Sequence, residues 1–202
     1  MNRKKTILAI LIVILGVIFR IFLVEIINIP NFEAVTALSL LSGSFFGGIY
    51  TAIIPLSIIF VSDFHFGNTS IYFFTWSAFI LIGILGTLIK ANSSYYIFKI
   101  TGMGFLSTLF FYLWTNFGWW LTFGMYEMTV GGLMQCYIAA LPFLKNQIFS
   151  VLIFVPSFAI LCPACAKLIA ISGIRKLVYS RGSAVFDSQR VMEGRGLEMI
   201  KI

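Results

Sequence analysis

The sequence predicts an all-α membrane protein with about six transmembrane helices and with both termini in the cytoplasm. Three observations predict this fold class: 60% of the 202 residues are hydrophobic, only 10% are charged, and the mean hydropathy is +1.01. A soluble domain of this size cannot bury so much apolar surface, so part of the chain should face lipid. The net charge is +7, and Lys and Arg gather at the two ends, as is typical of cytoplasmic termini. We expect a multi-pass protein of the plasma membrane that binds no nucleic acid.

The first predicted span begins directly after the basic start of the chain and carries Arg20 and Glu25 within it. Its apolar run is longer than that of a signal peptide, so we expect an uncleaved span that Pro30 ends. Arg20 lies about ten residues from that end, or roughly 15 Å, which is too deep for its side chain to reach the interface. We expect Arg20 to face the helix bundle and to pair with Asp63, Glu25 or Glu33.

Five further spans follow, and each is a mainly apolar stretch of the chain. The second is rich in Ser and Gly, which let helix backbones approach one another closely in a membrane. Pro55 should kink the third, and Asp63 and His65 should lie in the polar loop that follows it. The six predicted spans are residues 6–29, 34–48, 49–62, 71–89, 100–121 and 147–171. Residues 1–171 should form a single transmembrane domain, and residues 172–202 a basic cytoplasmic tail.

The segment 128–143 leaves two topologies open. In the first it is a re-entrant or interfacial helix on the outer side of the membrane, where protein or a cavity surrounds it. In the second it is a full span, and residues 34–62 form one long span instead of two. We prefer the first, because it keeps Lys90 and Lys99 cytoplasmic and puts four of the seven acidic residues on the outer side.

Polar and aromatic residues gather in the stretch 115–143. Together with Tyr112, the residues Asn116, Trp119 and Trp120 share one helix face, because they are spaced by three or four residues. An amide at membrane depth needs partners, and an aromatic wall with hydrogen-bonding groups suits a flat, partly polar small molecule. This face therefore predicts a binding site. For Trp119 and Trp120 alone, an aromatic belt at the membrane interface is an equally good interpretation.

Few residues point to catalysis or to a metal. The one His, His65, offers with Asp63 too few ligands for a metal site, and we interpret Asp63 as a helix cap. Cys162 and Cys165 have the spacing of a CxxC motif, but they lie in an apolar span, where packing is the better interpretation. The sequence contains no phosphate-binding loop, so we expect no enzyme, no cofactor and no use of ATP by this chain. A membrane enzyme that uses Asp63, His65 or Glu127 is a weaker alternative.

Several short blocks resemble an uncharacterised prokaryotic family of integral membrane proteins. The blocks are Thr115-Asn116-Phe117-Gly118-Trp119-Trp120, Cys136-Tyr137, Ala140-Leu141-Pro142-Phe143, Arg20, Pro30-Asn31-Phe32 and Ser62-Asp63. That family is in turn similar to the S components, the substrate-binding subunits, of energy-coupling factor transporters. The resemblance implies a six-helix membrane protein that binds a vitamin or a metal ion from outside. It also implies that a separate module, one membrane partner and two ATPases, supplies the energy.

We therefore expect a membrane subunit that binds a vitamin-like molecule or a metal ion for uptake and does not energise itself. Its expected partners are the lipid bilayer, a small-molecule ligand and a membrane coupling subunit with two ATPases. The alternative is a non-transport scaffold or partner subunit whose polar outer face docks another protein. Arg20 and Asp63 either set the charge of the site or form a purely structural ion pair. The predicted substrate-binding residues are Arg20, Asn31, Asp63, Tyr112, Asn116, Trp119, Trp120, Tyr126 and Tyr137.

Overall fold

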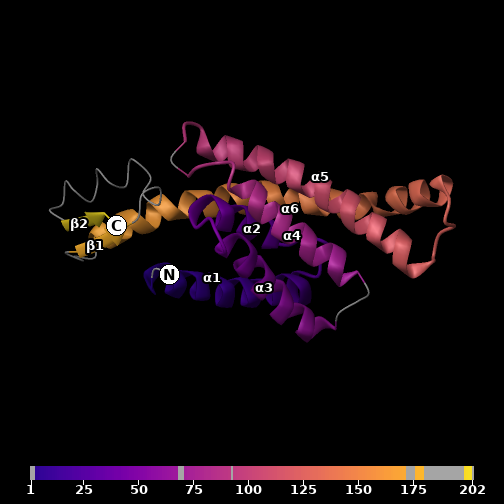
Figure 1. Cartoon of the computed structure of the whole chain (residues 1–202), viewed down its shortest axis with the longest axis horizontal. Coiled ribbons are helices and arrows are strands. Elements are labelled where there is room, and N and C mark those ends of the chain that lie inside the picture. Colours follow the sequence, from indigo (N-terminus) through magenta and orange to yellow (C-terminus); the bar gives the residue numbers. More distant parts are fainter. Residues whose placement is uncertain (1–2, 68–70, 92, 172–175, 180–197, 202) are drawn as a thin grey trace.

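The structure, a computed structural model, describes residues 3–67, 71–91, 93–171, 176–179 and 198–201, and it describes side chains for residues 6–67, 71–91 and 93–160. Almost all of these residues are helical (Figure 1). The α-helices are α1 (Arg3–Phe22), α2 (Val35–Phe45), α3 (Tyr50–Phe66), α4 (Tyr72–Gly86), α5 (Tyr96–Phe123) and α6 (Val130–Ile171). A π-helical turn, η1 (Leu23–Ile27), continues α1. Two short strands, β1 (Lys176–Tyr179) and β2 (Glu198–Lys201), pair in parallel in the predicted tail.

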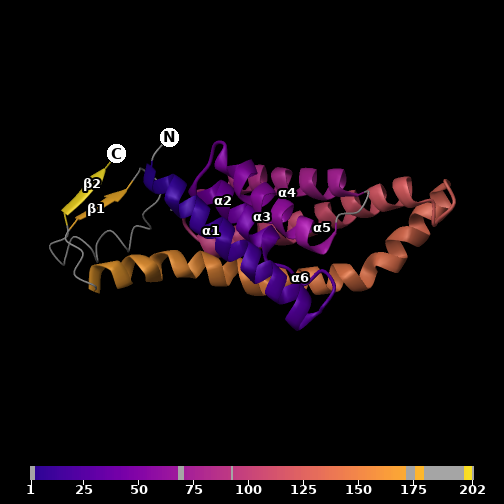
Figure 2. The ribbon, with the colours of Figure 1, turned by 90° about the horizontal axis from the view of Figure 1, so that it is seen from below.

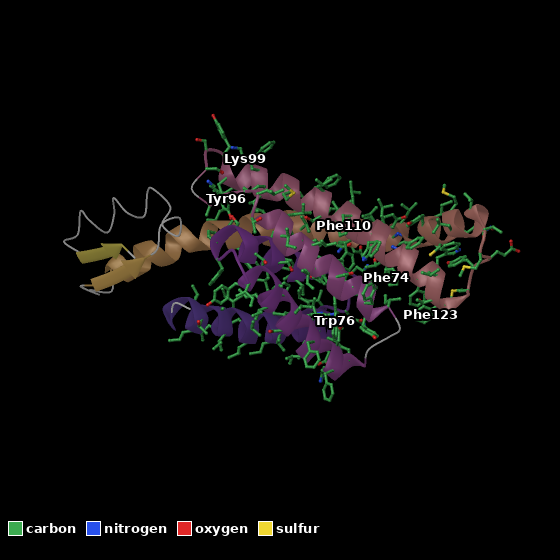
Figure 3. The ribbon with its side chains drawn as sticks, in the orientation of Figure 1. Phe74, Trp76, Tyr96, Lys99, Phe110 and Phe123 are labelled. Atoms are coloured by element: carbon green, nitrogen blue, oxygen red, sulfur yellow. The ribbon has the colours of Figure 1, made fainter. Side chains whose placement is uncertain are left out.

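Successive helices run back and forth along the long axis of the molecule, so that α1 begins and α6 ends at the same end (Figures 1 and 2). Figure 3 labels Lys99 at this end of α5 and Phe123 at the opposite end. We call these two ends of the bundle the Lys99 end and the Phe123 end. The connection from α5 to α6 therefore lies at the Phe123 end.

Three stretches are long and apolar enough to cross a membrane, judged by length and composition: Thr6–Ile27, Tyr96–Phe123 and Val130–Ile160. The helices α2, α3 and α4 are apolar as well, but they have only 11, 17 and 15 residues, and a crossing takes about 20. The prediction of about six spans is therefore supported for α1, α5 and α6 and not for the three shorter helices. Apolar side chains on α1 such as Leu15 and Ile18 are 64% and 60% exposed, as expected for a surface in lipid. These features indicate a membrane protein.

The predicted helix at 128–143 and the predicted span at 147–171 are one continuous helix, α6. Both topologies drawn from the sequence are wrong on this point. The polar residues 145–147 suggest a break, but no Gly follows Gly132 within the helix, and the helix continues through Pro142. With 42 residues, α6 is about 63 Å long, roughly twice the thickness of the apolar layer of a bilayer. Figure 2 shows the first part of α6 curving away from the end of α5.

A second correction concerns the end of α3. Asp63 and His65 lie within the helix, which runs to Phe66, and not in a loop or at a helix cap as predicted. The helix ends before Gly67, which has a φ of 78°. Glycine adopts this backbone angle readily, whereas most other residues would be strained there. The additional turn keeps the Asp63 side chain within reach of α1 and α4.

Glycines let the backbone of α4 contact the backbones of α2 and the start of α3. A Cβ atom added to Gly83 would lie 2.2 Å from the carbonyl oxygen of Thr51 on α3, and one added to Gly86 would lie 2.1 Å from that of Leu40 on α2. A Cβ atom added to Gly43 on α2 would lie 2.0 Å from the carbonyl oxygen of Gly83. The small residues of the second predicted span thus serve close helix packing, as the sequence predicts.

Aromatic rings fix α4 between α3 and α5. Phe74 at the start of α4, labelled in Figure 3, packs on Trp114 of α5 with 5.2 Å between the ring centroids. Phe79 of α4 packs on Phe111 of α5 with 4.9 Å between the centroids. On the other side, the Trp76 ring lies 5.8 Å from that of Phe60 on α3. Because both sides of α4 are held, the start of α4 has a fixed place beside the second half of α5.

Candidate ligand-binding site

A cavity of about 640 Å³ lies at the Phe123 end of the bundle. Its wall is formed by the end of α1 with η1, the segment 28–33, the first half of α4, the second half of α5, the connection 124–129 and the first half of α6. The volume falls within the range of about 300–1,000 Å³ that is typical of small-molecule sites. Most lining side chains are apolar or aromatic, and a few polar groups project among them, which is also typical of such sites.

The cavity brings together some of the predicted binding residues but not all of them. Asp63 contacts Arg20 from outside the lining, and Tyr112, Trp120 and Tyr137 also lie outside it. The predicted residues that line the cavity are Arg20, Asn31, Asn116, Trp119 and Tyr126.

The three predicted aromatic residues outside the cavity bind main-chain oxygens instead. Tyr112 Oη donates to the carbonyl oxygen of Tyr137 at 2.5 Å, and Tyr137 Oη donates to that of Leu113 at 3.1 Å. These two bonds join α5 to α6. Trp120 Nε1 donates to the carbonyl oxygen of Glu127 at 2.9 Å, which holds the connection between the two helices. Tyr112 and Trp120 lie on α5 and Tyr137 lies on α6, and helical spacing does not reveal the main-chain partners of these side chains.

On the cavity side of α5, Asn116 and Trp119 have fixed positions. Asn116 Nδ2 donates to the carbonyl oxygen of Tyr112, one helical turn earlier, at 2.8 Å. The Trp119 ring stacks on Phe123, with centroids 3.9 Å apart and an angle of 15° between the planes. An amide and an indole ring are therefore presented to the cavity from a single rigid helix.

Arg20 is neutralised by an acid at the cavity wall. Its Nη2 lies 2.9 Å from Asp63 Oδ1, and its Nη1 donates to Ser62 Oγ at 2.5 Å. The second carboxylate oxygen of Asp63 accepts a hydrogen bond from Trp76 Nε1 at 3.0 Å. The side chains of Arg20 and Asp63 are only 18% and 13% exposed. Of the three acids that the sequence offers as partners of Arg20, Asp63 is the one in contact, and the pair joins α1, α3 and α4.

The other two candidate acids have different roles. Glu25 Oε1 lies 2.8 Å from His65 Nε2, and both side chains are about half exposed, at 51% and 52%. This pair lies outside the cavity lining. Where side chains are described, no group of three or more His, Cys, Asp or Glu residues comes together as metal ligands could. Cys162 and Cys165 lie outside the residues whose side chains are described.

The segment 28–33 forms one wall of the cavity and has an ordered backbone. Asn28 and Asn31 adopt left-handed conformations, with φ of 52° and 57°, which Asn tolerates better than most residues. The N–H of Asn28 donates to the carbonyl oxygen of Leu23 at 3.0 Å and ends the π-helical turn. Single π-helical turns occur frequently at functional sites.

The helices α6 and α2 hold this segment in place. Asn146 Nδ2 donates to the carbonyl oxygen of Pro30 at 3.0 Å, and Ser150 Oγ donates to that of Glu33 at 2.7 Å. The Glu33 carboxyl group accepts a hydrogen bond from the N–H of Thr36 at 3.1 Å, in the first turn of α2. Burial raises the pKa of Glu33 above its ordinary value, and its hydrogen bonds act in the opposite direction.

Gln147 is a lining residue that the sequence analysis does not single out. It is 1% exposed, and its Nε2 has no hydrogen-bond partner in the part of the chain that the structure describes. Cys136, Ala140, Phe143 and Gln147 follow one another at intervals of four, three and four residues, and all line the cavity. This helical spacing could identify Gln147 as a lining residue from the sequence. The helix break predicted before residue 147 prevents this, because the break separates Gln147 from the other three residues of the face.

Comparison with known proteins gives one match. The sequence model of a family of unknown function, DUF6580, matches residues 1–169. No curated protein and no solved structure matches the chain. The match agrees with the expectation of an uncharacterised family, and it names no ligand or partner.

Proposed function

We propose that this chain, which belongs to the family of unknown function DUF6580, binds a small molecule within the membrane for its uptake. The observation that carries the proposal is the cavity of about 640 Å³, which Arg20, Asn116 and Gln147 line among aromatic side chains. Polar and charged groups at membrane depth are costly, and they commonly mark the path or the site of a substrate. A bundle that only needs to pack has no use for an amide such as Gln147 at this position.

The cavity is pre-formed, which favours a binding role. The Arg20–Asp63 pair fixes the α1 side of the wall, and the hydrogen bonds from Asn146 and Ser150 fix the segment 28–33. None of these contacts needs a ligand. A site whose wall is already ordered loses little conformational entropy when it binds, so it can bind a small molecule tightly.

The position of the cavity supports uptake from outside the cell. It lies at the Phe123 end, as do Glu25 in η1, Asp63 near the end of α3 and Glu127 between α5 and α6. The charge pattern of the sequence assigns these acids to the outer side. A ligand that arrives from the outer side therefore meets the cavity first.

The sequence contains no phosphate-binding loop, so uptake needs a separate source of energy. The resemblance to S components of energy-coupling factor transporters supplies one, namely a membrane coupling subunit with two ATPases. The chain is then the substrate-binding subunit of a larger complex in the plasma membrane and not an enzyme. Ligands of the vitamin class fit the aromatic wall better than a metal ion does, because none of the described acids except Glu33 lines the cavity.

Thermal unfolding of the purified protein in mild detergent tests this function. Vitamins, nucleobases and divalent metal ions are added one at a time, and the midpoint temperature is recorded. A ligand at 100 times its dissociation constant stabilises the folded protein by about 2.7 kcal/mol, which raises the midpoint by several degrees. If no compound raises the midpoint and no small molecule co-purifies, the proposal is wrong.

Purification of the tagged chain from its own cells tests the energy source. Recovery of a membrane protein together with two ATPases supports an S-component role. Recovery of an unrelated membrane complex without ATPases supports the alternative, a scaffold or partner subunit.

A further inference from the structure

Gln147 points to the class of ligand, because its amide nitrogen is buried and has no partner among the described residues. The side chain is 1% exposed, it lines the cavity, and its Nε2 contacts no acceptor among the described residues. A buried N–H donor without a partner costs the protein stability. An oxygen or nitrogen acceptor on a bound molecule removes that cost. The cavity is therefore built for an occupant that presents an acceptor to α6.

The charges in the wall favour an acceptor without a formal charge. The positive charge of Arg20 is offset by Asp63, 2.9 Å away, and one of its nitrogen atoms is bound to Ser62. Glu33 adds no positive charge, and burial raises its pKa, which favours its neutral form. A carboxylate that enters the cavity loses its hydration and finds no uncompensated cation in return. An uncharged carbonyl group loses much less.

The shape and composition of the wall favour a flat molecule. Phe79 and Phe111 line the cavity with their ring centroids 4.9 Å apart, and Phe143 adds a ring from α6. Aromatic rings pack well on flat ligands, either offset or edge to face. The lining on α6 extends from Cys136 to Gln147, which is about 16 Å along the helix axis. A molecule of two or three fused rings fits this length.

We infer that the ligand is a planar aromatic amide or lactam, uncharged, whose carbonyl oxygen accepts a hydrogen bond from Gln147 Nε2. This inference rests on the proposed function and makes it more specific. Gln147 determines specificity in this account, because it distinguishes a carbonyl compound from a hydrocarbon of the same shape. The aromatic rings of the wall contribute to the affinity for both kinds of compound.

Three naphthalenes of nearly equal size test the inference. Naphthalene-2-carboxamide presents an uncharged carbonyl, naphthalene-2-carboxylate presents a charged one, and 2-methylnaphthalene presents no hydrogen-bond acceptor. Their dissociation constants are measured by calorimetry with the full chain in mild detergent, and titrations into empty micelles are subtracted. The carboxamide should bind at least about 10-fold more tightly than either of the others, because only it satisfies Gln147 without bringing a charge.

The variant Gln147→Leu identifies the residue responsible. It removes the unpartnered amide and retains the approximate volume, so the folded protein should keep its stability without ligand. It should bind the carboxamide no more tightly than 2-methylnaphthalene. Ser107→Ala is the matched control, because Ser107 Oγ is also buried and unpartnered in the described part of α5 but does not line the cavity. This control should bind all three compounds as the original protein does.

The outcomes separate this inference from the proposed function. Equal binding of 2-methylnaphthalene and the carboxamide, or an unchanged preference in Gln147→Leu, overturns the inference but leaves a small-molecule site. Tighter binding of the carboxylate overturns the argument that the ligand is uncharged. If none of the three binds while another compound raises the unfolding temperature, the inference alone is wrong. If none binds and no compound raises that temperature, both are wrong.

Discussion

Arg20 of α1 and Asp63 of α3 form an ion pair at the wall of the cavity, with 2.9 Å between Nη2 and Oδ1. Each partner is held by a further group, since Ser62 Oγ accepts from Arg20 and Trp76 Nε1 donates to Asp63. Both side chains are mostly buried. The pair therefore fixes the relative positions of α1, α3 and α4, and it offsets the only positive charge in the lining of the cavity described by the structure.

Replacing Asp63 with Ala should destabilise the protein strongly. The change leaves the Arg20 guanidinium group buried without its counter-charge, and removing one partner of a buried pair typically costs about 3–5 kcal/mol. We expect a loss of about 3 kcal/mol in the free energy of unfolding, because the two side chains keep 18% and 13% exposure. Thermal unfolding in mild detergent measures the change.

Two further variants check that the burial of an unpaired charge is the cause. The double variant Arg20→Met with Asp63→Leu should recover most of the lost stability, because no charge is then left unpaired. Glu25→Gln breaks the exposed pair with His65 and should change the free energy of unfolding by less than about 1 kcal/mol. Equal losses in Asp63→Ala and Glu25→Gln would show that the burial of the first pair has no energetic role.

Replacing Gly83 with Ala should also destabilise the bundle. The added Cβ atom would lie 2.2 Å from the carbonyl oxygen of Thr51, so α4 and the start of α3 must move apart. Overpacking of this kind costs about 1–3 kcal/mol. Gly102→Ala in α5 is the matched control, because a Cβ atom there meets nothing within 4 Å. It should raise the free energy of unfolding by about 0.5–1 kcal/mol, since Ala favours a helix over Gly. Unfolding curves of the two variants should therefore shift in opposite directions.

The stability of the protein should fall as the pH rises through the titration of Glu33. Burial raises the pKa of Glu33 in the folded protein above the ordinary value of 4.5. Between the unfolded and the folded pKa, the folded state retains a proton that the unfolded state has lost, so folding becomes less favourable as the pH increases. The contribution of this proton is fully present below pH 4.5 and disappears above the raised pKa.

The variant Glu33→Gln isolates this effect. It cannot titrate at this position, so its unfolding temperature relative to that of the original protein should increase from pH 4 upward and then reach a plateau. Measurements of both proteins across a series of buffers give this difference. A difference that stays constant with pH, or that decreases, contradicts the raised pKa.

The two neighbouring tryptophans of α5 should respond differently to substitution. Trp119 lines the cavity, whereas Trp120 donates to the carbonyl oxygen of Glu127. Trp119→Leu should weaken the binding of any ligand found by at least about 10-fold, because truncating a Trp that anchors a bound partner commonly costs about 2 kcal/mol or more. Trp120→Leu should lower the unfolding temperature and leave the affinity nearly unchanged. Equal effects of the two substitutions on affinity would favour the aromatic belt that the sequence also allows.

Local chemistry in the sequence predicts part of this structure well. A charge deep in an apolar span needs an acid nearby, and the sequence offers Asp63, Glu25 or Glu33 as that partner of Arg20. The structure shows that Asp63 is the one in contact. The spacing of Asn116 and Trp119 predicts a shared helix face, and both line the cavity. The helical character of the described residues between 6 and 160 follows from composition and hydropathy in the same way.

The parts that the sequence does not predict depend on contacts between distant segments. The residues 145–147 are polar, as a loop would be, but in the structure Gln147 is buried against the cavity and α6 continues. Likewise Tyr112 and Tyr137 carry hydroxyl groups of the kind that bind ligands, but each hydroxyl group donates to a main-chain oxygen of the neighbouring helix. The periodicity of the sequence shows which face of a helix a side chain occupies. It does not show which group on another helix forms a hydrogen bond with that side chain.

Native mass spectrometry of the protein released from mild detergent tests the binding function most directly. We predict a peak for the chain with one small molecule bound, which is weaker or absent when Trp119→Leu is purified in parallel. Fragmentation of that peak should yield a compound with an aromatic ring. A protein that carries no small molecule, and that gains none when incubated with an extract of its own cells, would contradict the assignment of the cavity as a ligand site.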